Sequence, residues 1–331
     1  MQTQNTDMNN IGVVYKKLLG HYAVHHANMI TTCVLSSKLW KKFEVTHADG
    51  DSHRVIAVHE KHMDPVAVGD RVIFRPVKDG TGLILEILPR RNYLARGSAK
   101  PNPRAYSFEQ VIAANLDQII PVFAAANPRP KWHMLDRILV AAEAHQIAST
   151  ILITKFDLVK GRKDEDELLS AINRYKEIGY PVIVTSAKAK MGLDALKNAL
   201  GHRTSLLVGK SGVGKSTLMN ILEPGLDLKI QSVNPSTGKG RHTTSHLEMF
   251  PLAMGGNIID TPGTREFGIW GLAPENLADC FPEMRNFIGK CKFGLSCQHD
   301  EEPGCAIRKS VMNGTISPFR YKSYLRMRMD L

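Results

Sequence analysis

The sequence predicts a multidomain α/β protein with an N-terminal OB-like β-barrel, a central α/β domain and a C-terminal cysteine-containing domain. Short β-rich runs separated by turns fill residues 11–92, strand-like and helical segments alternate from residue 118, and three cysteines cluster after residue 290. The chain has 331 residues, whereas single domains usually hold about 100 to 200, so more than one hydrophobic core is expected. We place the domains at 1–95, 96–272 and 273–331.

The chain is basic, with 43 Lys and Arg against 32 Asp and Glu, a net charge of +11. Because released counterions favour binding to phosphates, nucleic acid is the first expectation for a large partner. A basic soluble protein without such a partner has the same composition, so charge alone does not distinguish these two possibilities. The sequence has no apolar run of about 18 residues and no leader-like start, so we expect no membrane contact and a cytoplasmic location.

The N-terminal region shows the spacing of a small β-barrel. Strand-like runs at 32–35, 54–59 and 71–75 are broken by turns such as Gly69-Asp70 and Asp79-Gly80. About five short strands suit an oligonucleotide-binding (OB) barrel. An SH3-like barrel or a small open sheet has the same spacing, so the pattern leaves the three alternatives open.

A basic stretch follows the barrel. Its arginines and lysine are interleaved with aromatic rings that can stack on bases while the cations pair with phosphates. A solvated linker has the same composition and is the equal alternative. The residues are Arg90, Arg91, Tyr93, Arg96, Lys100, Pro101, Pro103, Arg104 and Tyr106.

The central region alternates strands and helices. Strands are expected at 118–124, 150–154 and 181–185, and helices at 134–145 and 164–177. Alternation at this length predicts a parallel sheet with crossover helices. In such open sheets, ligands bind at the carboxyl ends of the strands.

A phosphate-binding loop lies between a predicted strand, 204–208, and a predicted helix, 216–222. Its glycines let backbone N–H groups point at phosphate oxygens, the lysine reaches the terminal phosphates, and the serine hydroxyl can ligate Mg²⁺. The residues expected to contact nucleotide here are Gly209, Lys210, Ser211, Gly212, Val213, Gly214, Lys215, Ser216 and Thr217. Of these, Lys215 is also a predicted catalytic residue and Ser216 the predicted magnesium ligand.

A second motif supports the nucleotide interpretation. The strand predicted at 254–260 ends in Asp260-Thr261-Pro262-Gly263. An aspartate at such a strand end can hold Mg²⁺, and the Gly263 amide can contact a γ-phosphate. An ordinary strand-to-loop turn is the alternative.

Two short motifs indicate guanine as the base. Thr154, Lys155 and Asp157 follow the strand at 150–154, and the Asp157 carboxylate can accept hydrogen bonds from guanine N1 and N2, a donor pair that adenine lacks. Ser186, Ala187 and Lys188 follow the strand at 181–185, where backbone amides can receive guanine O6. GTP is therefore the expected nucleotide.

The motif order is circularly permuted, because the guanine motifs precede the phosphate loop instead of following it. Permutation, an N-terminal barrel, the segment 238–244 and a C-terminal Cys/His cluster together resemble the ribosome small-subunit-dependent GTPases, the RsgA (YjeQ) family. The resemblance spans nearly the whole chain. It implies hydrolysis of GTP to GDP and phosphate, stimulation by the small ribosomal subunit, contact with its rRNA, and a part in late maturation of that subunit. A monomer is expected.

The chain departs from the family at the guanine motif. The family usually has Asn-Lys-x-Asp, and Thr154 stands in place of the Asn. The substitution removes an amide that braces the phosphate loop and contacts the base, so looser guanine selectivity is expected.

Catalysis needs a group that orients the attacking water. The residues after Gly263 include no glutamine. The resemblance implies His242 instead, with Thr243 and Thr244 sensing Mg²⁺ and the γ-phosphate. A surface-loop histidine that contacts RNA is the alternative for His242.

The C-terminal cysteines predict a structural zinc site. Cys291, Cys297, His299 and Cys305 supply three thiolates and one imidazole, a closed ligand set that leaves no open catalytic position. The family's first spacing is usually one residue shorter, which a loop can absorb. Free cysteines beside a chance histidine are the alternative. A basic tail follows, with Arg308, Lys309, Arg320, Lys322, Arg326 and Arg328.

Two other classes of protein share some of these features. A P-loop kinase would carry no guanine-selective aspartate, so Asp157 argues against it. An RNA-binding module with a weak or vestigial nucleotide site would carry a damaged phosphate loop, whereas Gly214, Lys215 and Ser216 are intact.

Overall fold

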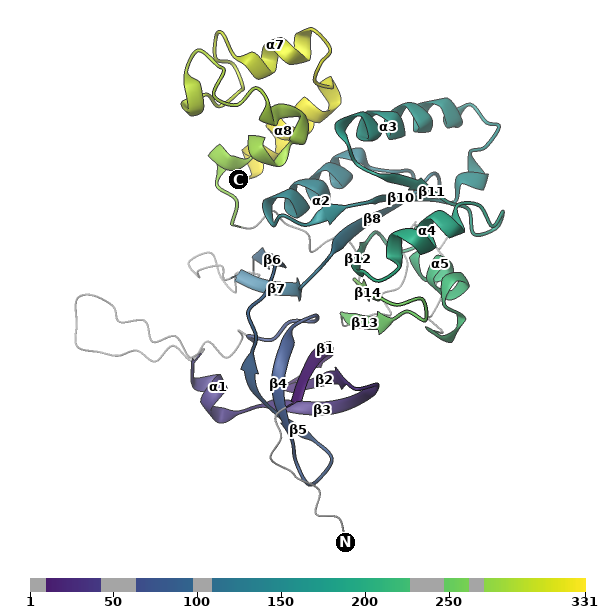
Figure 1. Cartoon of the computed structure of the whole chain (residues 1–331). Helices are drawn as coiled ribbons and strands as arrows, with labels where there is room; N and C mark the ends of the chain where they lie inside the picture. The colour runs from purple at the N-terminus through teal and green to yellow at the C-terminus, as the bar shows by residue number, and fades with distance from the viewer. Residues whose placement is uncertain (1–9, 43–63, 98–108, 227–246, 262–270) are drawn as a thin grey trace, which may run out of the picture.

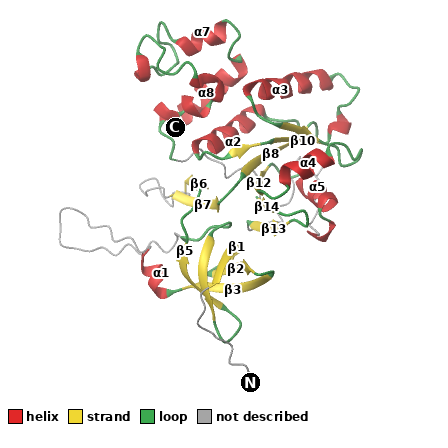
Figure 2. Cartoon of the chain, viewed as in Figure 1, coloured by secondary structure: helices red, strands yellow, loops and turns green. Residues whose placement is uncertain are grey.

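A computed structural model describes residues 10–42, 64–97, 109–226, 247–261 and 271–331. A β-barrel lies at one end of the molecule, the α/β domain is next to it, and a helical C-terminal unit packs on the far side of the α/β domain (Figures 1 and 2). The predicted multidomain α/β class is confirmed.

The barrel has the strand order of an OB fold. β1 (Asn10–Leu18), β2 (His21–His26), β3 (Met29–Leu35), β5 (Gly82–Ile87) and β4 (Arg71–Pro76) neighbour one another in that order, and β4 closes the barrel on β1. β3 and β5 run parallel and the other pairs antiparallel. The short helix α1 (Ser37–Lys42) follows β3. This closed five-stranded order selects the OB-like alternative; the strand expected at 54–59 lies outside the described residues.

The stretch after the barrel is partly a hairpin. β6 (Tyr93–Gly97) pairs with β7 (Glu109–Ala114), and the predicted boundary between residues 95 and 96 falls inside β6. Arg90 donates to both carboxylate oxygens of the fully buried Asp70, each at 2.7 Å. Arg90 therefore stabilises the barrel, and its expected role as a phosphate contact is wrong. Residues 98–108 of the predicted basic stretch are outside the described residues.

The central domain is built on a mainly parallel sheet. Its strands are ordered β11 (Val182–Val184), β10 (Ile151–Thr154), β8 (Gln118–Ala124), β12 (Thr204–Val208), β14 (Asn257–Asp260) and β13 (Glu248–Pro251), of which β13 is antiparallel; β9 (Ala148–Ser149) pairs with β8. β14 begins later than expected because Gly255 and Gly256 form a turn with positive φ.

Helices cover both faces of this sheet. α2 (Trp132–Ala144) and α3 (Asp164–Ile178) pack on one face around Ile119 and Leu139, and α4 (Leu193–Leu200) and α5 (Lys215–Leu222) pack on the other around Ile120 and Leu196. Every residue of β8 is buried, as expected for a central strand in a two-sided sheet. Short 3-10 helices lie at Phe156–Leu158 and Pro224–Leu226.

The sheet continues into the barrel. β13 pairs with β1 at Glu248 and Lys16, whose side chains also form an ion pair at 2.8 Å. The two domains therefore share one 12-stranded sheet.

The C-terminal unit consists of short helices held against α2. They are α6 (Pro282–Arg285), α7 (Ala306–Met312), α8 (Pro318–Asp330) and 3-10 helices at Pro274–Asn276, Ala278–Cys280 and Gly294–Ser296. Phe281, Ile307 and Tyr324 form its core together with Val140 of α2. Arg320 is 2% exposed and paired with Asp136 and Glu283, so this member of the predicted basic tail is part of the core.

Candidate nucleotide site and metal centre

The phosphate loop connects β12 to α5, as the sequence predicted. Residues 209–214 lie between the end of β12 at Val208 and the start of α5 at Lys215. A Cβ on Gly209 would lie 2.6 Å from the carbonyl oxygen of Val122, and Gly214 has φ of +98°. Both positions therefore need glycine, and the loop runs close against β8 before it opens the helix.

Lys215 and Asp260 are both largely buried and lie close to each other. The Lys215 Nζ donates to the Gly209 carbonyl at 2.7 Å and lies 4.0 Å from Asp260 Oδ1. Burial lowers the pKa of Lys215 and raises the pKa of Asp260. Asp260 Oδ1 is buried and accepts no hydrogen bond from the described residues. A divalent cation or its bound water would satisfy this oxygen, so the site fits Mg²⁺ held near Ser216 and Asp260.

The first guanine motif supports the phosphate loop. The Thr154 hydroxyl donates to the carbonyl of Val213, and Lys155 Nζ donates to the Gly212 carbonyl at 2.6 Å. Lys155 also donates to the carbonyl of Asn127 at 2.6 Å. The expected loss of bracing at Thr154 is therefore wrong, because the hydroxyl donates a hydrogen bond to the phosphate loop.

The second guanine motif orients Asp157. Parallel pairing of β10 with β11 brings the ends of the two strands together, and Ser186 Oγ donates to Asp157 Oδ1 at 2.5 Å. Backbone hydrogen bonds between Ser186 and Met191 close the loop that contains Ala187 and Lys188. The arrangement presents a fixed carboxylate beside a turn of backbone amides, as recognition of a guanine edge requires.

The predicted nucleotide residues that the structure describes thus gather at the carboxyl ends of β10, β11, β12 and β14. His242, Thr243, Thr244 and Gly263 lie outside the described residues, and their roles stay predictions. Sequence reasoning missed Asn127, Phe123 and Val213 as backbone acceptors for the motif side chains. Because every residue has a carbonyl, no sequence signal could have found them.

The four predicted metal ligands converge. Their ligand atoms all lie within 4.8 Å of one another. Cys291 Sγ and Cys305 Sγ are 3.8 Å apart, and each is 3.5 Å from His299 Nδ1. A tetrahedral Zn²⁺ with Zn–S of about 2.3 Å and Zn–N of about 2.0 Å requires S···S of about 3.8 Å and S···N of about 3.5 Å. Cys291, Cys305 and His299 therefore have the spacing of zinc ligands, and Cys297 Sγ lies within 4.8 Å of each of them.

The surroundings of these ligands also suit a cation. Burial raises the pKa of Cys297 to about 12 and also raises the pKa of Cys305, so adjacent thiolates need a positive charge to be stable. The backbone N–H of Ala306 donates to Cys291 Sγ at 3.3 Å. Tyr321 donates to the carbonyl of His299 at 2.7 Å and so fixes the loop that carries the imidazole.

Fold and site together define a circularly permuted P-loop GTPase with an appended OB barrel and a Cys₃His centre. The sequence model described as RsgA GTPase matches residues 87–270. The chain belongs to the RsgA GTPase family. It is a GTP hydrolase, not a kinase or an RNA-binding module with a vestigial site, and the resemblance seen in the sequence is confirmed.

Similar proteins agree over most of the chain. The small ribosomal subunit biogenesis GTPase RsgA of Gemmatimonas aurantiaca is 46% identical over 277 residues, covering 82% of this chain and 87% of that protein. The protein of the same name from Bacteroides fragilis is 43% identical, covering 81% of this chain and 84% of that protein. The crystal structure of YjeQ from Thermotoga maritima matches with a TM-score of 0.71 at 29% sequence identity, covering 98% of this chain and 99% of that chain. The crystal structure of YloQ, a circularly permuted GTPase, matches with a TM-score of 0.70 at 28% identity, covering 100% of this chain and 97% of that chain. No helix in the described part of the chain is long and apolar enough to cross a membrane.

Proposed function

We propose that this GTPase binds the small ribosomal subunit and assists its late maturation, with GTP hydrolysis as a conformational switch that the subunit stimulates. The observation that carries the proposal is that both guanine motifs, the phosphate loop and Asp260 meet in a domain that lies between an OB barrel and a Cys₃His unit. The names of the similar proteins indicate the same subunit. The protein acts in the cytoplasm as a monomer and contacts rRNA.

The nucleotide is GTP with Mg²⁺. The backbone of the 209–216 loop holds the phosphates, Lys215 lies against the terminal phosphates, and Ser216 and Asp260 hold the ion, which neutralises charge on the phosphates when bound. Asp157 selects guanine, supported by Thr154 and Lys155. His242 orients the attacking water, with Thr243, Thr244 and the Gly263 amide near the γ-phosphate.

Zinc is structural in this proposal. Cys291, Cys297, His299 and Cys305 use all four positions of a tetrahedral ion, so the ion stabilises the C-terminal unit and takes no part in hydrolysis.

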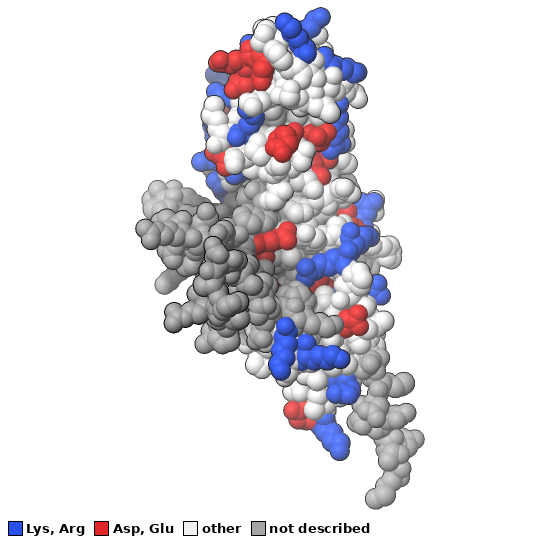
Figure 3. Space-filling view, turned by 90° about the vertical axis from the view of Figure 1, so that its left-hand side faces the viewer, with Lys and Arg blue, Asp and Glu red and all other residues white. Residues whose placement is uncertain are grey.

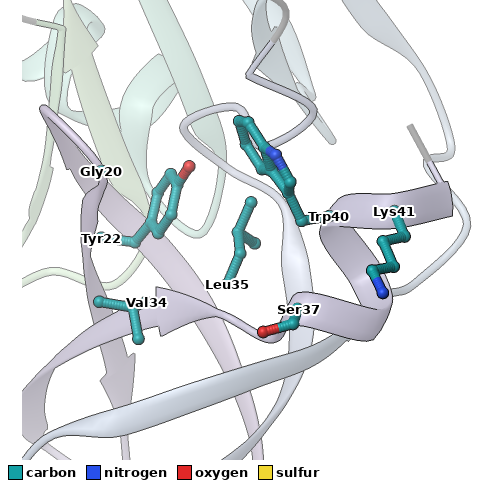
Figure 4. Close-up of a pocket in the computed structure, with 7 residues that line it drawn as sticks. All are labelled: Gly20, Tyr22, Val34, Leu35, Ser37, Trp40 and Lys41. Atoms are coloured by element: carbon teal, nitrogen blue, oxygen red, sulfur yellow. The ribbon is translucent and has the colours of Figure 1, made fainter. Parts of the chain in front are cut away.

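The barrel contributes an aromatic hollow to the rRNA contact. Tyr22, Leu35 and Trp40 face a common space of about 340 Å³, with Lys41 on the same helix as Trp40 (Figure 4). Tyr22 is committed to a hydrogen bond with Asp64 at 2.7 Å, whereas Trp40 is 41% exposed. Trp40 is therefore the ring available to stack on a base. On the face of the molecule shown in Figure 3, Lys and Arg side chains lie on both the barrel and the C-terminal unit, where they can contact phosphates of rRNA.

The test is GTP and ATP hydrolysis by the purified protein, with and without purified small ribosomal subunits, alongside Lys215→Ala. We expect turnover that is GTP-selective, stimulated by subunits and lost in the variant. Turnover indifferent to subunits would refute the ribosomal partner while leaving the GTPase assignment intact. Hydrogen exchange compared between GDP and a non-hydrolysable GTP analogue tests the switch, and identical exchange in the two states would refute it.

A further inference from the structure

A cleft of about 350 Å³ lies where α8 of the C-terminal unit meets α2 and α3 of the central domain. None of the predicted nucleotide residues lines it, although the charge of Lys210 in the phosphate loop reaches the His133 ring. Its volume is in the range of sites that hold small organic groups. The side chains that give it chemical character are Trp132, His133, Arg174, Phe319, Lys322 and Arg326.

The acidic group at the base of this cleft is already satisfied. The buried Asp136 carboxylate accepts from Arg320 at 2.6 Å, from the Tyr175 hydroxyl at 2.8 Å and from Ser323. Arg320 is in turn paired with Glu283 at 2.6 Å. Asp136 therefore does not repel an anion as an isolated carboxylate would, and the network fixes α8 against α2.

The walls of the cleft are cationic. Arg174, Lys322 and Arg326 line it, and none of them forms an ion pair with a carboxylate in the described part of the chain. Glu167 is the one further acidic residue that lines it. Burial, followed by the nearby charge of Arg326, lowers the pKa of His133, so its ring is neutral at pH 7. The charge balance favours an anionic occupant.

Aromatic rings lie beside these cations. Phe319 is 69% exposed, and the Arg174 guanidinium covers one face of its ring at 4.7 Å. Trp132 is held against Tyr175 with ring centroids 5.8 Å apart. Phe319 is thus an exposed ring and Trp132 a half-buried one. Aromatic rings next to arginine are the elements with which proteins hold bases of single-stranded nucleic acid.

We propose that this cleft binds one unpaired nucleotide of an RNA strand, with its base against Phe319 and Trp132 and its phosphates on Arg174, Lys322 and Arg326. The proposal rests on the proposed function, because it deepens how the protein contacts rRNA. A base inside an A-form helix cannot enter, since its faces are already stacked, so the occupant comes from a loop, bulge or end.

The first experiment uses Trp132 as a local probe in the full chain. The variant Trp40→Phe/Trp270→Phe leaves Trp132 as the sole tryptophan, since the sequence contains three. It is titrated with oligouridylate and with an abasic sugar-phosphate oligomer of equal length, while anisotropy of labelled oligomer reports total binding. We expect oligouridylate to quench Trp132 and the abasic oligomer to quench it much less. Saturating RNA binding without quenching, or equal quenching by both oligomers, would overturn the proposal.

Charge and stacking are tested in the same background. Phe319→Ala should weaken the oligouridylate midpoint at Trp132 about fivefold or more. Lys322→Glu/Arg326→Glu should reduce the salt dependence of that midpoint by about 1.4 logarithmic units per decade of salt. The matched control Lys290→Glu/Lys309→Glu makes the same charge change on exposed residues of the same unit outside the cleft and should keep the quenching. A Phe319→Ala midpoint equal to the parent's, or equal losses in the two charge variants, would contradict the proposal.

An experiment with purified small ribosomal subunits distinguishes failure of the cleft proposal from failure of the proposed function. If small subunits fail to bind even the unaltered protein, the proposed function fails, whatever the oligomers show. If subunits bind and crosslink through 4-thiouridine to the Trp132 or Phe319 peptide, the cleft assignment is supported. If they bind and no crosslink falls in either peptide, the cleft assignment fails while the proposed function stands. Zinc content and thermal melting of each variant establish that it is folded.

Discussion

Removal of the Thr154 hydroxyl tests how the phosphate loop is held. Thr154 is 2% exposed and donates to the carbonyl of Val213. Thr154→Val keeps the shape of the side chain and leaves that carbonyl without its donor, which costs about 1–3 kcal/mol when the carbonyl stays buried. Without nucleotide the loop can relax and expose the carbonyl to water, so the cost appears on binding. We expect GDP and GTP affinities to fall about 5-fold to 150-fold.

Isothermal titration calorimetry with GDP, GTP and ATP measures this effect. Thr154→Ser keeps the hydroxyl and should bind within about threefold of the parent, as expected for a retained hydrogen bond. In Thr154→Val, the ratio of guanine to adenine affinity should stay constant, because the hydroxyl contacts the loop and Asp157 reads the base. Normal affinity in Thr154→Val, or a Ser variant as weak as the Val variant, would refute the bracing. A changed base preference would place the hydroxyl on the base instead.

Three further perturbations test other parts of the site. Asp157→Asn should lower the affinity for GTP at least about tenfold in competition binding, since charge-assisted hydrogen bonds contribute about 1.5–3 kcal/mol each. The same variant should raise the affinity for xanthosine triphosphate, whose 2-oxo group accepts a hydrogen bond from the new amide. An unchanged base preference would show that Asp157 is not part of the guanine site. Cys291→Ser should lose bound zinc in metal analysis and amide protection of α7 in hydrogen exchange while GDP still binds, and full zinc content would contradict the ligand assignment. Asp136→Ala should lower the free energy of unfolding in urea by about 3–5 kcal/mol, because it breaks a buried pair with Arg320, and a loss below about 1 kcal/mol would show that Glu283 alone satisfies that guanidinium.

The sequence predicted those features whose functional residues and backbone conformation both belong to one short segment of the chain. The 209–216 loop needs glycines, a lysine and a serine in one contiguous run, and the strand before it and the helix after it follow from local pattern. The four zinc ligands lie within 15 residues, so their convergence needs only one folded loop. The position of Asp157 just after a strand was equally visible, because β10 is a short apolar run that ends at Thr154.

The features that sequence missed depend on partners far along the chain. Arg90 and Arg320 look like free cations, yet the first is bound to Asp70 and the second to Asp136, which is 184 positions away. A charge pattern cannot distinguish a phosphate contact from a buried ion pair when the carboxylate comes from another element. The choice of OB barrel also required pairing information, since only the β3–β5 and β1–β4 contacts define that closure.

The two ends of the molecule are attached to the nucleotide domain in different ways. The barrel is attached through β13, which pairs with β1 on one side and with β14 on the other. β14 carries Asp260 at one end and, at the other, Asn257, which accepts a hydrogen bond from barrel residue Tyr15 at 2.8 Å. β14 is hydrogen-bonded on both sides, to β12 and β13, so it moves as part of the sheet. The C-terminal unit is instead fixed to α2 through Asp136, on an outer helix. If the proposed switch displaces Asp260 on loss of the γ-phosphate, the pairing of β14 with β13 and of β13 with β1 is the connection through which the barrel would follow.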